Sequence, residues 1–351
     1  MSQHFETLSF LGMRAIIAST AMRRLMETIR RAAPSNATVL IRGESGSGKE
    51  LVARALHHYS VRASKPWVDL SCAALPEHLV ESELFGFERG AFSGADYTKQ
   101  GLFELASQGT LFLDEVAELE PKLQVKLLRV LDGNPFYRLG GTKKIPVDVR
   151  LVAATNQDLE TAVRNGRFRN DLYHRLAQIE VHVPPLRNRV EDIVPIANMF
   201  LEQQNPNMRF DTESQHLLRG YSWPGNVREL RNVVVKCAVL ADSNVLTADD
   251  LPADLQMSTK YDSASDDLYR LGTSLSNAVT ISPVEAAAIS GGTMLEGMEK
   301  QMILKVLTET GGHYQRTAEL LGISRRTLSR KMKLYERDLA TPVEQRHQDC
   351  I

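Results

Sequence analysis

The 351-residue sequence has little cysteine, little tryptophan and almost no net charge. Its three cysteines, Cys72, Cys237 and Cys350, are far apart. Their number and spacing argue against a disulfide framework and a cysteine-based zinc site. Lysine and arginine number 42 against 43 aspartates and glutamates, so the formal net charge is −1. Since the whole molecule has no positive field, any contact with nucleic acid must come from a local basic patch.

Long apolar runs and targeting signals are also missing. No run approaches the roughly 18 residues of a membrane span, and the N-terminus has no signal-peptide core. These absences predict a soluble cytoplasmic protein that does not contact a membrane. The composition, 43% hydrophobic and 24% charged, is that of an ordered globular chain. The length favours two or three domains.

Short apolar runs alternate with helical patterns between about residues 19 and 255. The apolar runs suit strands covered on both faces, and the longest helical patterns are residues 49–58 and 121–132. Alternation of this kind predicts an α/β fold with a parallel sheet. The expected strands are residues 38–41, 67–70, 111–113, 150–154 and 179–183.

A glycine-rich octapeptide follows the first expected strand and precedes a helix. It reads Gly43-Glu44-Ser45-Gly46-Ser47-Gly48-Lys49-Glu50. Its glycines let successive N–H groups face one anion, while Lys49 and the helix N-terminus add positive charge. Glu50 stands where the strict P-loop pattern has serine or threonine. A plain Gly/Ser turn is the alternative, but the strand and helix around it favour a phosphate cradle.

The apolar strand Thr110-Leu111-Phe112-Leu113 ends in Asp114 and Glu115. This is the form of a Walker B element, in which Asp114 would hold Mg²⁺ and Glu115 would activate the attacking water. Taken alone, such a pair is more often a solvated strand end. Together with the glycine-rich loop, it predicts Mg²⁺-dependent ATP hydrolysis.

Four downstream polar residues fit around this site. Asn156 follows an expected strand and would lie beside the γ-phosphate. Arg169 and Arg175 would ordinarily make surface ion pairs, but in a ring ATPase one of them could reach the neighbouring subunit's phosphate. Arg228 begins a helix after a Pro-Gly turn and could contact the nucleotide from a helical lid.

At these residues the sequence resembles the AAA+ domain of NtrC-type enhancer-binding proteins, the activators of sigma-54 RNA polymerase. The resemblance covers about residues 15–255. It includes Glu83-Leu84-Phe85-Gly86 and the hexapeptide Gly90-Ala91-Phe92-Ser93-Gly94-Ala95, which is similar to the family's G-A-F-T-G-A loop. The resemblance assigns Asn156 to sensor I and Arg228 to sensor II, and it makes Glu50 the usual residue at its position.

The resemblance implies a protein that is a dimer at rest and forms a hexameric ring when active. The ring would hydrolyse ATP at its subunit interfaces. Movement of the loop over residues 85–98 would remodel the closed promoter complex through contact with sigma-54. Without the resemblance, the hexapeptide would be a tight turn with a buried phenylalanine. Ser93 replaces the family's threonine, which keeps the hydroxyl and removes one methyl group, ~0.8 kcal/mol if buried.

The C-terminal part begins after a Ser-, Thr-, Asp- and Gly-rich stretch that predicts a flexible linker. Three short helices follow, and the last is basic and begins after the capping Ser324. This pattern is typical of a helix-turn-helix and is similar to the Fis-type domain of enhancer-binding proteins. A solvated hairpin used for oligomerisation is the alternative. The residues expected to contact double-stranded enhancer DNA are Ser324, Arg325, Arg326, Thr327, Arg330, Lys331 and Lys333.

These observations predict an AAA+ ATPase with a helical lid and a Fis-type helix-turn-helix. The alternative is an AAA+ DNA-binding regulator that acts without sigma-54 remodelling. Most relatives carry a sensory domain before the ATPase, whereas only about 15 residues precede it here; we expect either control by a partner, by expression level or by the linker, or a truncated chain. The expected divisions are a tail over 1–14, an ATPase core over 15–187, a lid over 188–255, a linker over 256–293, a DNA-binding domain over 294–337 and a tail over 338–351.

Overall fold

The structure is a computed structural model that describes residues 5–256 and eight single residues further on, namely 303, 307, 313, 314, 316, 317, 328 and 332. The chain forms two compact units, Met1–Leu268 and Tyr269–Ile351. The expected linker after Gln256 and all seven expected DNA-binding residues lie outside the described residues.

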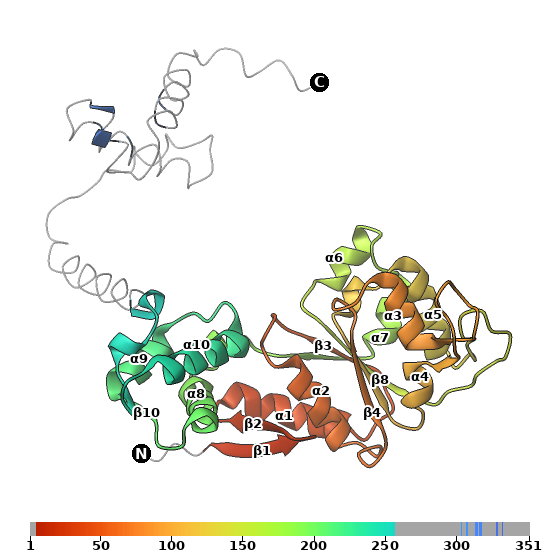
Figure 1. Cartoon of the computed structure of the whole chain (residues 1–351), viewed down its shortest axis with the longest axis horizontal. Helices are drawn as coiled ribbons and strands as arrows, with labels where there is room; N and C mark the ends of the chain where they lie inside the picture. Colours follow the sequence, from red (N-terminus) through yellow and green to blue (C-terminus); the bar gives the residue numbers. More distant parts are fainter. Residues whose placement is uncertain are drawn as a thin grey trace, which may run out of the picture. The chain divides into compact units, whose positions relative to one another are not determined.

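A five-stranded parallel sheet forms the centre of the first unit, as the sequence predicts (Figure 1). Its strand order is β4-β7-β8-β3-β9, and every neighbouring pair is parallel. All five expected strands are present, each with ends within one residue of the prediction. Their bounds are Val39–Arg42 (β3), Trp67–Ser71 (β4), Thr110–Asp114 (β7), Arg150–Thr155 (β8) and Ile179–His182 (β9).

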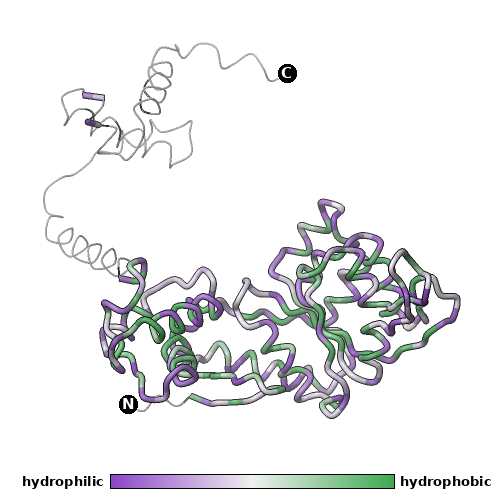
Figure 2. Tube along the Cα trace, in the orientation of Figure 1, coloured by the Kyte–Doolittle hydropathy of each residue, from purple (hydrophilic) through white to green (hydrophobic). Residues whose placement is uncertain are grey.

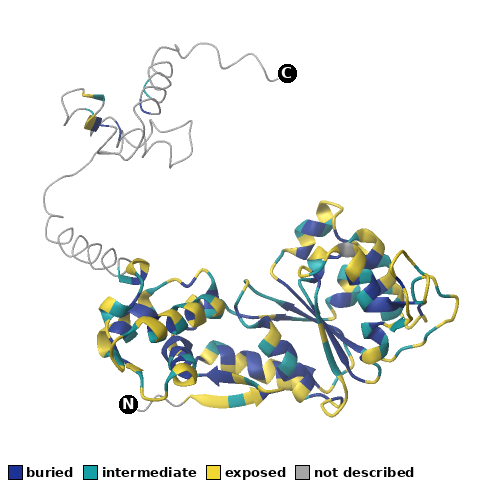
Figure 3. Ribbon diagram, in the orientation of Figure 1, coloured by how far each residue is buried: buried dark blue, intermediate teal, exposed yellow. Residues whose placement is uncertain are grey.

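Both faces of the sheet are covered, because alternate strand residues point to opposite sides. Val39 and Ile41 join one hydrophobic cluster, whereas Leu40 joins the other. Burial on both sides explains why the central strands β3, β7 and β8 are among the most hydrophobic stretches of the chain (Figure 2) and are mostly buried (Figure 3), whereas β4 and β9 at the edges of the sheet are more exposed. The fold class predicted from the alternation of apolar runs is confirmed.

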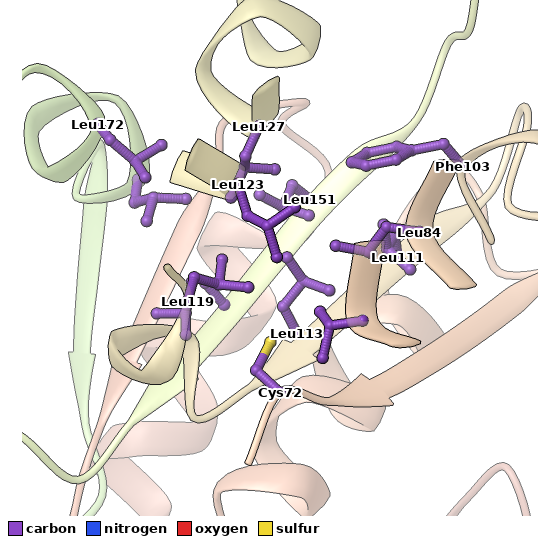
Figure 4. Packing of buried hydrophobic residues seen from close by; sticks show 14 of the residues in the cluster. Cys72, Leu84, Phe103, Leu111, Leu113, Leu119, Leu123, Leu127, Leu151 and Leu172 are labelled. Atoms are coloured by element: carbon purple, nitrogen blue, oxygen red, sulfur yellow. The ribbon is translucent and has the colours of Figure 1, made fainter. Parts of the chain in front are cut away.

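Seven helices surround the sheet (Figure 1). One cluster packs under α1 and α2; the other lies beneath α3, α5 and α7, where leucines from helices and strands interlock around Cys72 (Figure 4). The helix expected over residues 49–58 has those bounds, and the one expected over 121–132 ends one residue earlier. The bounds are Thr20–Ala32 (α1), Lys49–His58 (α2), Glu77–Phe85 (α3), Leu102–Leu105 (α4), Pro121–Leu131 (α5), Leu159–Arg164 (α6) and Asn170–Leu176 (α7).

Two antiparallel pairs of strands lie outside the central sheet. Strands β1 (Glu6–Phe10) and β2 (Met13–Ile17) form a hairpin, and β1 is largely exposed (Figure 3). No pattern in the sequence predicts this hairpin, which begins inside the stretch expected to be a tail. Strands β5 (Gly86–Phe87) and β6 (Lys99–Gln100) pair in the same way. Residues 88–98 connect these two strands.

A helical subdomain, here called the lid, follows the sheet. It packs around the fully buried Trp223, whose indole N–H donates to the Leu218 carbonyl oxygen at 2.8 Å. The lid consists of α8 (Val190–Gln204), α9 (Thr212–Gly220), α10 (Asn226–Leu240), the parallel pair β10 (Arg209–Phe210) and β11 (Val245–Leu246), and short 3₁₀ turns at Leu186–Asn188 and Ala248–Asp250.

Candidate functional site

Residues 43–50, here called the P-loop, connect β3 to the N-terminus of α2. Gly46 and Gly48 have φ angles of 73° and 104°, a region that side chains disfavour. A Cβ atom on Gly46 would also lie 2.5 Å from the carbonyl oxygen of Gly225. The backbone conformation thus requires glycine at Gly46 and Gly48. At Gly46 the close contact with the lid requires it as well. The loop ends at a helix N-terminus, which attracts anions.

The Walker lysine and the Walker glutamate meet in the structure. Lys49 is buried, and its Nζ lies 3.2 Å from Glu115 Oε1 and 3.1 Å from the Gly43 carbonyl oxygen. The second carboxylate oxygen of Glu115 accepts a hydrogen bond from the backbone N–H of Asn156 at 3.1 Å. The carboxyl ends of β3, β7 and β8 therefore bring together three residues that are far apart in the sequence.

Asp114 is the last residue of β7, and its Oδ1 accepts the backbone N–H of Glu115 at 3.0 Å. Burial, and then the charge of Glu115, raise the pKa of Asp114. Within the described part of the chain, no cluster of three or more histidine, cysteine, aspartate or glutamate residues could hold a metal. A single carboxylate beside a phosphate cradle still suits Mg²⁺, which takes its other ligands from phosphate and water.

These residues lie along a cavity of about 360 Å³. One end is polar and is formed by residues 45–51 with Asp114 and Glu115. Ser47 Oγ is buried in the P-loop and has no hydrogen-bond partner among the described residues. The β1–β2 hairpin and the lid contribute apolar side chains to the lining, namely Met13, Ile16, Ile196, Met199 and Phe200, together with Arg14, Arg231 and Asn232. The cavity thus combines polar groups suited to phosphates with an apolar surface suited to a base.

The lid contacts the P-loop directly. Arg228, expected from the sequence to reach the nucleotide, lines the cavity and donates from Nη1 to Ser45 Oγ at 2.7 Å. Arg187 and Asn226 both hydrogen-bond Glu44, and these two bonds lower the pKa of Glu44 to about 2. Sequence analysis assigned no role to Arg187 or Asn226. The only signal for Asn226 was its place after the Pro-Gly turn.

Two arginines, Arg169 and Arg175, could act on a phosphate bound by a neighbouring subunit. Neither of them lines the cavity of its own chain. Arg169 forms an exposed ion pair with Asp171 at 2.7 Å, and Arg175 donates to the Leu131 carbonyl oxygen at 2.6 Å. Within the single chain, Arg169 therefore makes a surface ion pair, which is the ordinary role of such an arginine. Action on a neighbouring subunit stays a prediction. Asn156 is exposed at the end of β8 and touches Glu115 through its backbone.

The hexapeptide 90–95 lies at the end of the β5–β6 ribbon. The Gly90 N–H donates to the Ala95 carbonyl oxygen at 2.8 Å, and Gly90 and Gly94 have φ angles of 82° and 98°. Phe92 is 44% exposed, and its ring meets that of Phe87 in a T-shaped contact with centroids 5.0 Å apart. The alternative of a turn with a buried phenylalanine is therefore wrong, because the aromatic ring faces solvent.

Ser93 is exposed as well, so the missing methyl group costs no packing within this chain. The loop rests on the segment that follows α5: the Glu88 N–H donates to the Leu139 carbonyl oxygen at 3.0 Å, and Arg138 pairs with Glu88 at 3.0 Å. A Cβ atom on Gly140 would lie 2.8 Å from Ala91 Cβ. The loop therefore has a fixed base and an exposed tip.

Two adjacent histidines at the end of a helix, here His57 and His58 of α2, are expected from the sequence to be exposed or to interact with the helix end, but for His57 this expectation is wrong. His57 is 1% exposed, and its Nδ1 lies 2.9 Å from Thr110 Oγ1. Its Nε2 has no hydrogen-bond partner among the described residues. Only His58 is exposed. Cys72 and Cys237 are buried and free of any disulfide.

In the second unit, Ile303 and Leu328 are buried together, with Tyr314 and Met332 packed against them. These contacts agree with a small helical core. None of the helices over the described parts of the chain has the length and hydrophobicity that a membrane crossing demands.

Three family profiles match successive parts of the chain. The sigma-54 interaction domain matches residues 15–182, the AAA+ ATPase lid domain matches residues 187–268, and the bacterial regulatory protein Fis family matches residues 294–335. The regulatory protein AtoC of Escherichia coli is 43% identical over 92% of this chain and 68% of its own length. The DNA-binding transcriptional regulator NtrC of Proteus hauseri is 43% identical over 89% of this chain and 68% of its own length.

Solved structures agree with these matches. Crystal structures of NtrX from Brucella abortus in complex with ADP and with ATP are each 38% identical to this chain, with TM-scores of 0.64 and 0.63. The ADP complex aligns with 91% of this chain and 69% of the NtrX chain. The chain thus has a sigma-54 interaction domain, an AAA+ lid domain and a Fis-family domain in that order. The chain belongs to the NtrC-type family of sigma-54-dependent transcriptional regulators, which combine an AAA+ nucleotide-hydrolysing domain with a Fis-type helix-turn-helix.

Proposed function

We propose that this chain hydrolyses MgATP within an oligomeric ring and uses the energy to remodel the closed complex of sigma-54 RNA polymerase at an enhancer-controlled promoter. The observation that carries the proposal is the buried contact of 3.2 Å between Lys49 and Glu115, beside Asp114 and at the mouth of the cavity. It joins the group that binds phosphate to the group that activates water.

Each polar residue then has a definite task. Lys49 and the N-terminus of α2 balance the charge of the phosphates, and Arg228 contacts them from the lid. Asp114 would hold Mg²⁺, whose charge would stabilise the leaving phosphate oxygens. Glu115 would orient the attacking water, with Asn156 fixing one of its carboxylate oxygens. Since Arg169 and Arg175 stand apart from the cavity, we assign them to the phosphate bound by the neighbouring subunit.

The contact with sigma-54 is assigned to residues 90–95. An exposed aromatic ring on a glycine-bounded tip gives a transient partner one large apolar anchor. The fixed base formed with the 138–140 segment would transmit movement of the core to this tip. DNA binding is assigned to Ser324, Arg325, Arg326, Thr327, Arg330, Lys331 and Lys333, through a helix in the major groove.

The substitution Glu115→Gln tests the hydrolytic part of the proposal. It keeps the shape of the side chain and removes the base, so kcat should fall by about 10²–10⁴-fold. Binding of ATP, measured by calorimetry, should remain near that of the original protein, because the phosphate cradle is intact. Glu118→Gln is the matched control, since Glu118 is exposed and its carboxylate accepts a hydrogen bond from the Gln157 side chain, outside the cavity. Undiminished turnover by Glu115→Gln would place the base elsewhere.

A further inference from the structure

The lid binds three consecutive carbonyl groups of the P-loop. Asn226 Nδ2 donates to the Ser45 carbonyl oxygen at 3.1 Å, and the backbone N–H of Val227 donates to that of Gly46 at 3.0 Å. The third carbonyl group, that of Ser47, accepts a hydrogen bond from Arg189 Nη2. All three donors belong to the segment 187–268 that matches the lid profile.

The direction of these carbonyl groups fixes the direction of the neighbouring amides. In a trans peptide the C=O and the following N–H point in opposite directions. With the Ser45 and Ser47 carbonyl groups held by the lid, the N–H groups of Gly46 and Gly48 point away from it. The Ser47 N–H stays inside the loop, where it donates to the Glu44 carbonyl oxygen at 3.2 Å. The lid thus orients amides that a phosphate cradle needs.

Asn226 is the central group in this contact. It is 0% exposed, and its side chain is fully used. Besides the bond to Ser45, its Nδ2 donates to Glu44 Oε2 at 3.0 Å, and its Oδ1 accepts the Leu186 N–H at 2.7 Å. Its φ of 53° lies in the left-handed region, where asparagine is enriched among residues with side chains. The buried side-chain amide of Asn226 therefore connects the P-loop with α10 and with the backbone at Leu186. The packing of a helix does not require so many hydrogen bonds.

We propose that Asn226 is a positioning residue for nucleotide binding: through the Ser45 carbonyl it holds the P-loop in the conformation that accepts phosphate. The lid therefore contributes to affinity for the nucleotide before any contact of its own with the ligand. This inference rests on the proposed ATPase function. It separates Asn226 from Arg228, because Asn226 is placed to act through the loop and does not line the cavity.

Two substitutions remove the donor in different ways. Asn226→Asp keeps the shape, the left-handed φ and the acceptor for Leu186, but loses the N–H donors and faces the charge of Glu44. Asn226→Gly also suits the positive φ and adds no charge. Asn207→Asp is the matched control, because Asn207 is an exposed asparagine of the lid.

The measurement is ADP affinity by calorimetry, together with KM and kcat for ATP hydrolysis, on the full chain. Both Asn226 variants should bind ADP about tenfold more weakly, which corresponds to about 1.4 kcal/mol. KM should rise in parallel and kcat should change by less than about twofold, because an effect on uniform binding appears in KM. Asn207→Asp should match the original protein.

A loss of kcat with unchanged ADP affinity in both variants would overturn the inference, because that is the pattern of a merely structural residue. Weakened binding by Asn226→Asp alone would also overturn it, since repulsion from Glu44 would then be the cause. If Asn226→Asp does not fold, as judged by thermal unfolding, Asn226→Gly decides the question. A parent protein that binds no ADP would overturn the proposed function itself, a result distinct from any difference between the variants.

Discussion

Several residues of the catalytic site can be recognised in the sequence, because the backbone geometry that requires them is set by their immediate neighbours in the chain. The P-loop glycines are needed for positive φ angles and close contact, and Asp114 and Glu115 end a strand that its apolar run defines. Arg189 is different. It is 3% exposed and binds the Ser47 carbonyl oxygen from a position 142 residues later. No local pattern distinguishes it from an ordinary surface arginine.

His57 gives a prediction about pH at the residue scale. Its burial, assisted by the charges of Arg150 and His58, lowers its pKa in the folded protein. The unfolded chain then binds the proton more readily, so the folded state loses stability as the pH falls below the ordinary histidine value. Between pH 7 and 5.5 the free energy of unfolding should fall by up to about 1.4 kcal/mol per pH unit more in the original protein than in His57→Gln.

Urea unfolding at a series of pH values measures this difference. His216→Gln is the control, because His216 on α9 is exposed and does not act on His57, and its stability should follow that of the original protein. Equal pH dependence in the original protein and in His57→Gln would show that His57 does not carry the effect.

At the scale of elements, the helical lid is tied to the core by a buried carboxylate. Asp192 on α8 is 0% exposed. Its Oδ1 accepts the backbone N–H groups of Ala18 and Ser19, and its Oδ2 accepts the Ser19 hydroxyl, all at 2.7 Å. Ser19 in turn caps α1 through a bond from the Met22 N–H at 3.2 Å. One side chain therefore fixes the entry to a core helix from the lid.

Asp192→Ala should destabilise the protein by about 2–4 kcal/mol, because it leaves three donors without their partner in a buried place. Chemical denaturation with urea checks the value. Glu191→Ala, at an exposed position of the same helical turn, should change stability by less than about 0.5 kcal/mol. A loss for Asp192→Ala no greater than that of this control would contradict the assigned role.

The elements also show where sequence reasoning succeeds and fails. The central strands β3, β7 and β8 could be predicted because burial on both faces leaves largely apolar runs, and the less buried edge strands β4 and β9 still have apolar residues at half or more of their positions. The β1–β2 hairpin could not, because three of the five residues of β1 are exposed and its part in the cavity depends on distant elements. His57 was misjudged because a polar residue at a helix end gives no sign that Trp67 and Thr110 cover it.

At the scale of the whole molecule, ATP hydrolysis and DNA binding are assigned to different units. The cavity and its catalytic residues lie within Met1–Leu268, whereas the Fis-type match covers residues 294–335 of the other unit. Removing residues 294–351 should therefore abolish specific DNA binding, while ATP turnover per folded subunit stays within about twofold, since no catalytic group is lost. Mobility-shift and ATPase assays on the same preparation test both statements. Specific DNA binding by the shortened chain would locate the DNA contact in the ATPase unit.

The central claim is that nucleotide turnover drives a contact between residues 90–95 and sigma-54. Its most direct test is binding of purified sigma-54 to the protein loaded with ADP and aluminium fluoride, which stands in for the transferring phosphoryl group. We expect a complex that depends on this nucleotide state and is lost in Phe92→Ala, whose target ring is exposed. Absence of a complex from a chain that hydrolyses ATP would contradict the claim and favour a DNA-binding regulator that does not remodel sigma-54 polymerase.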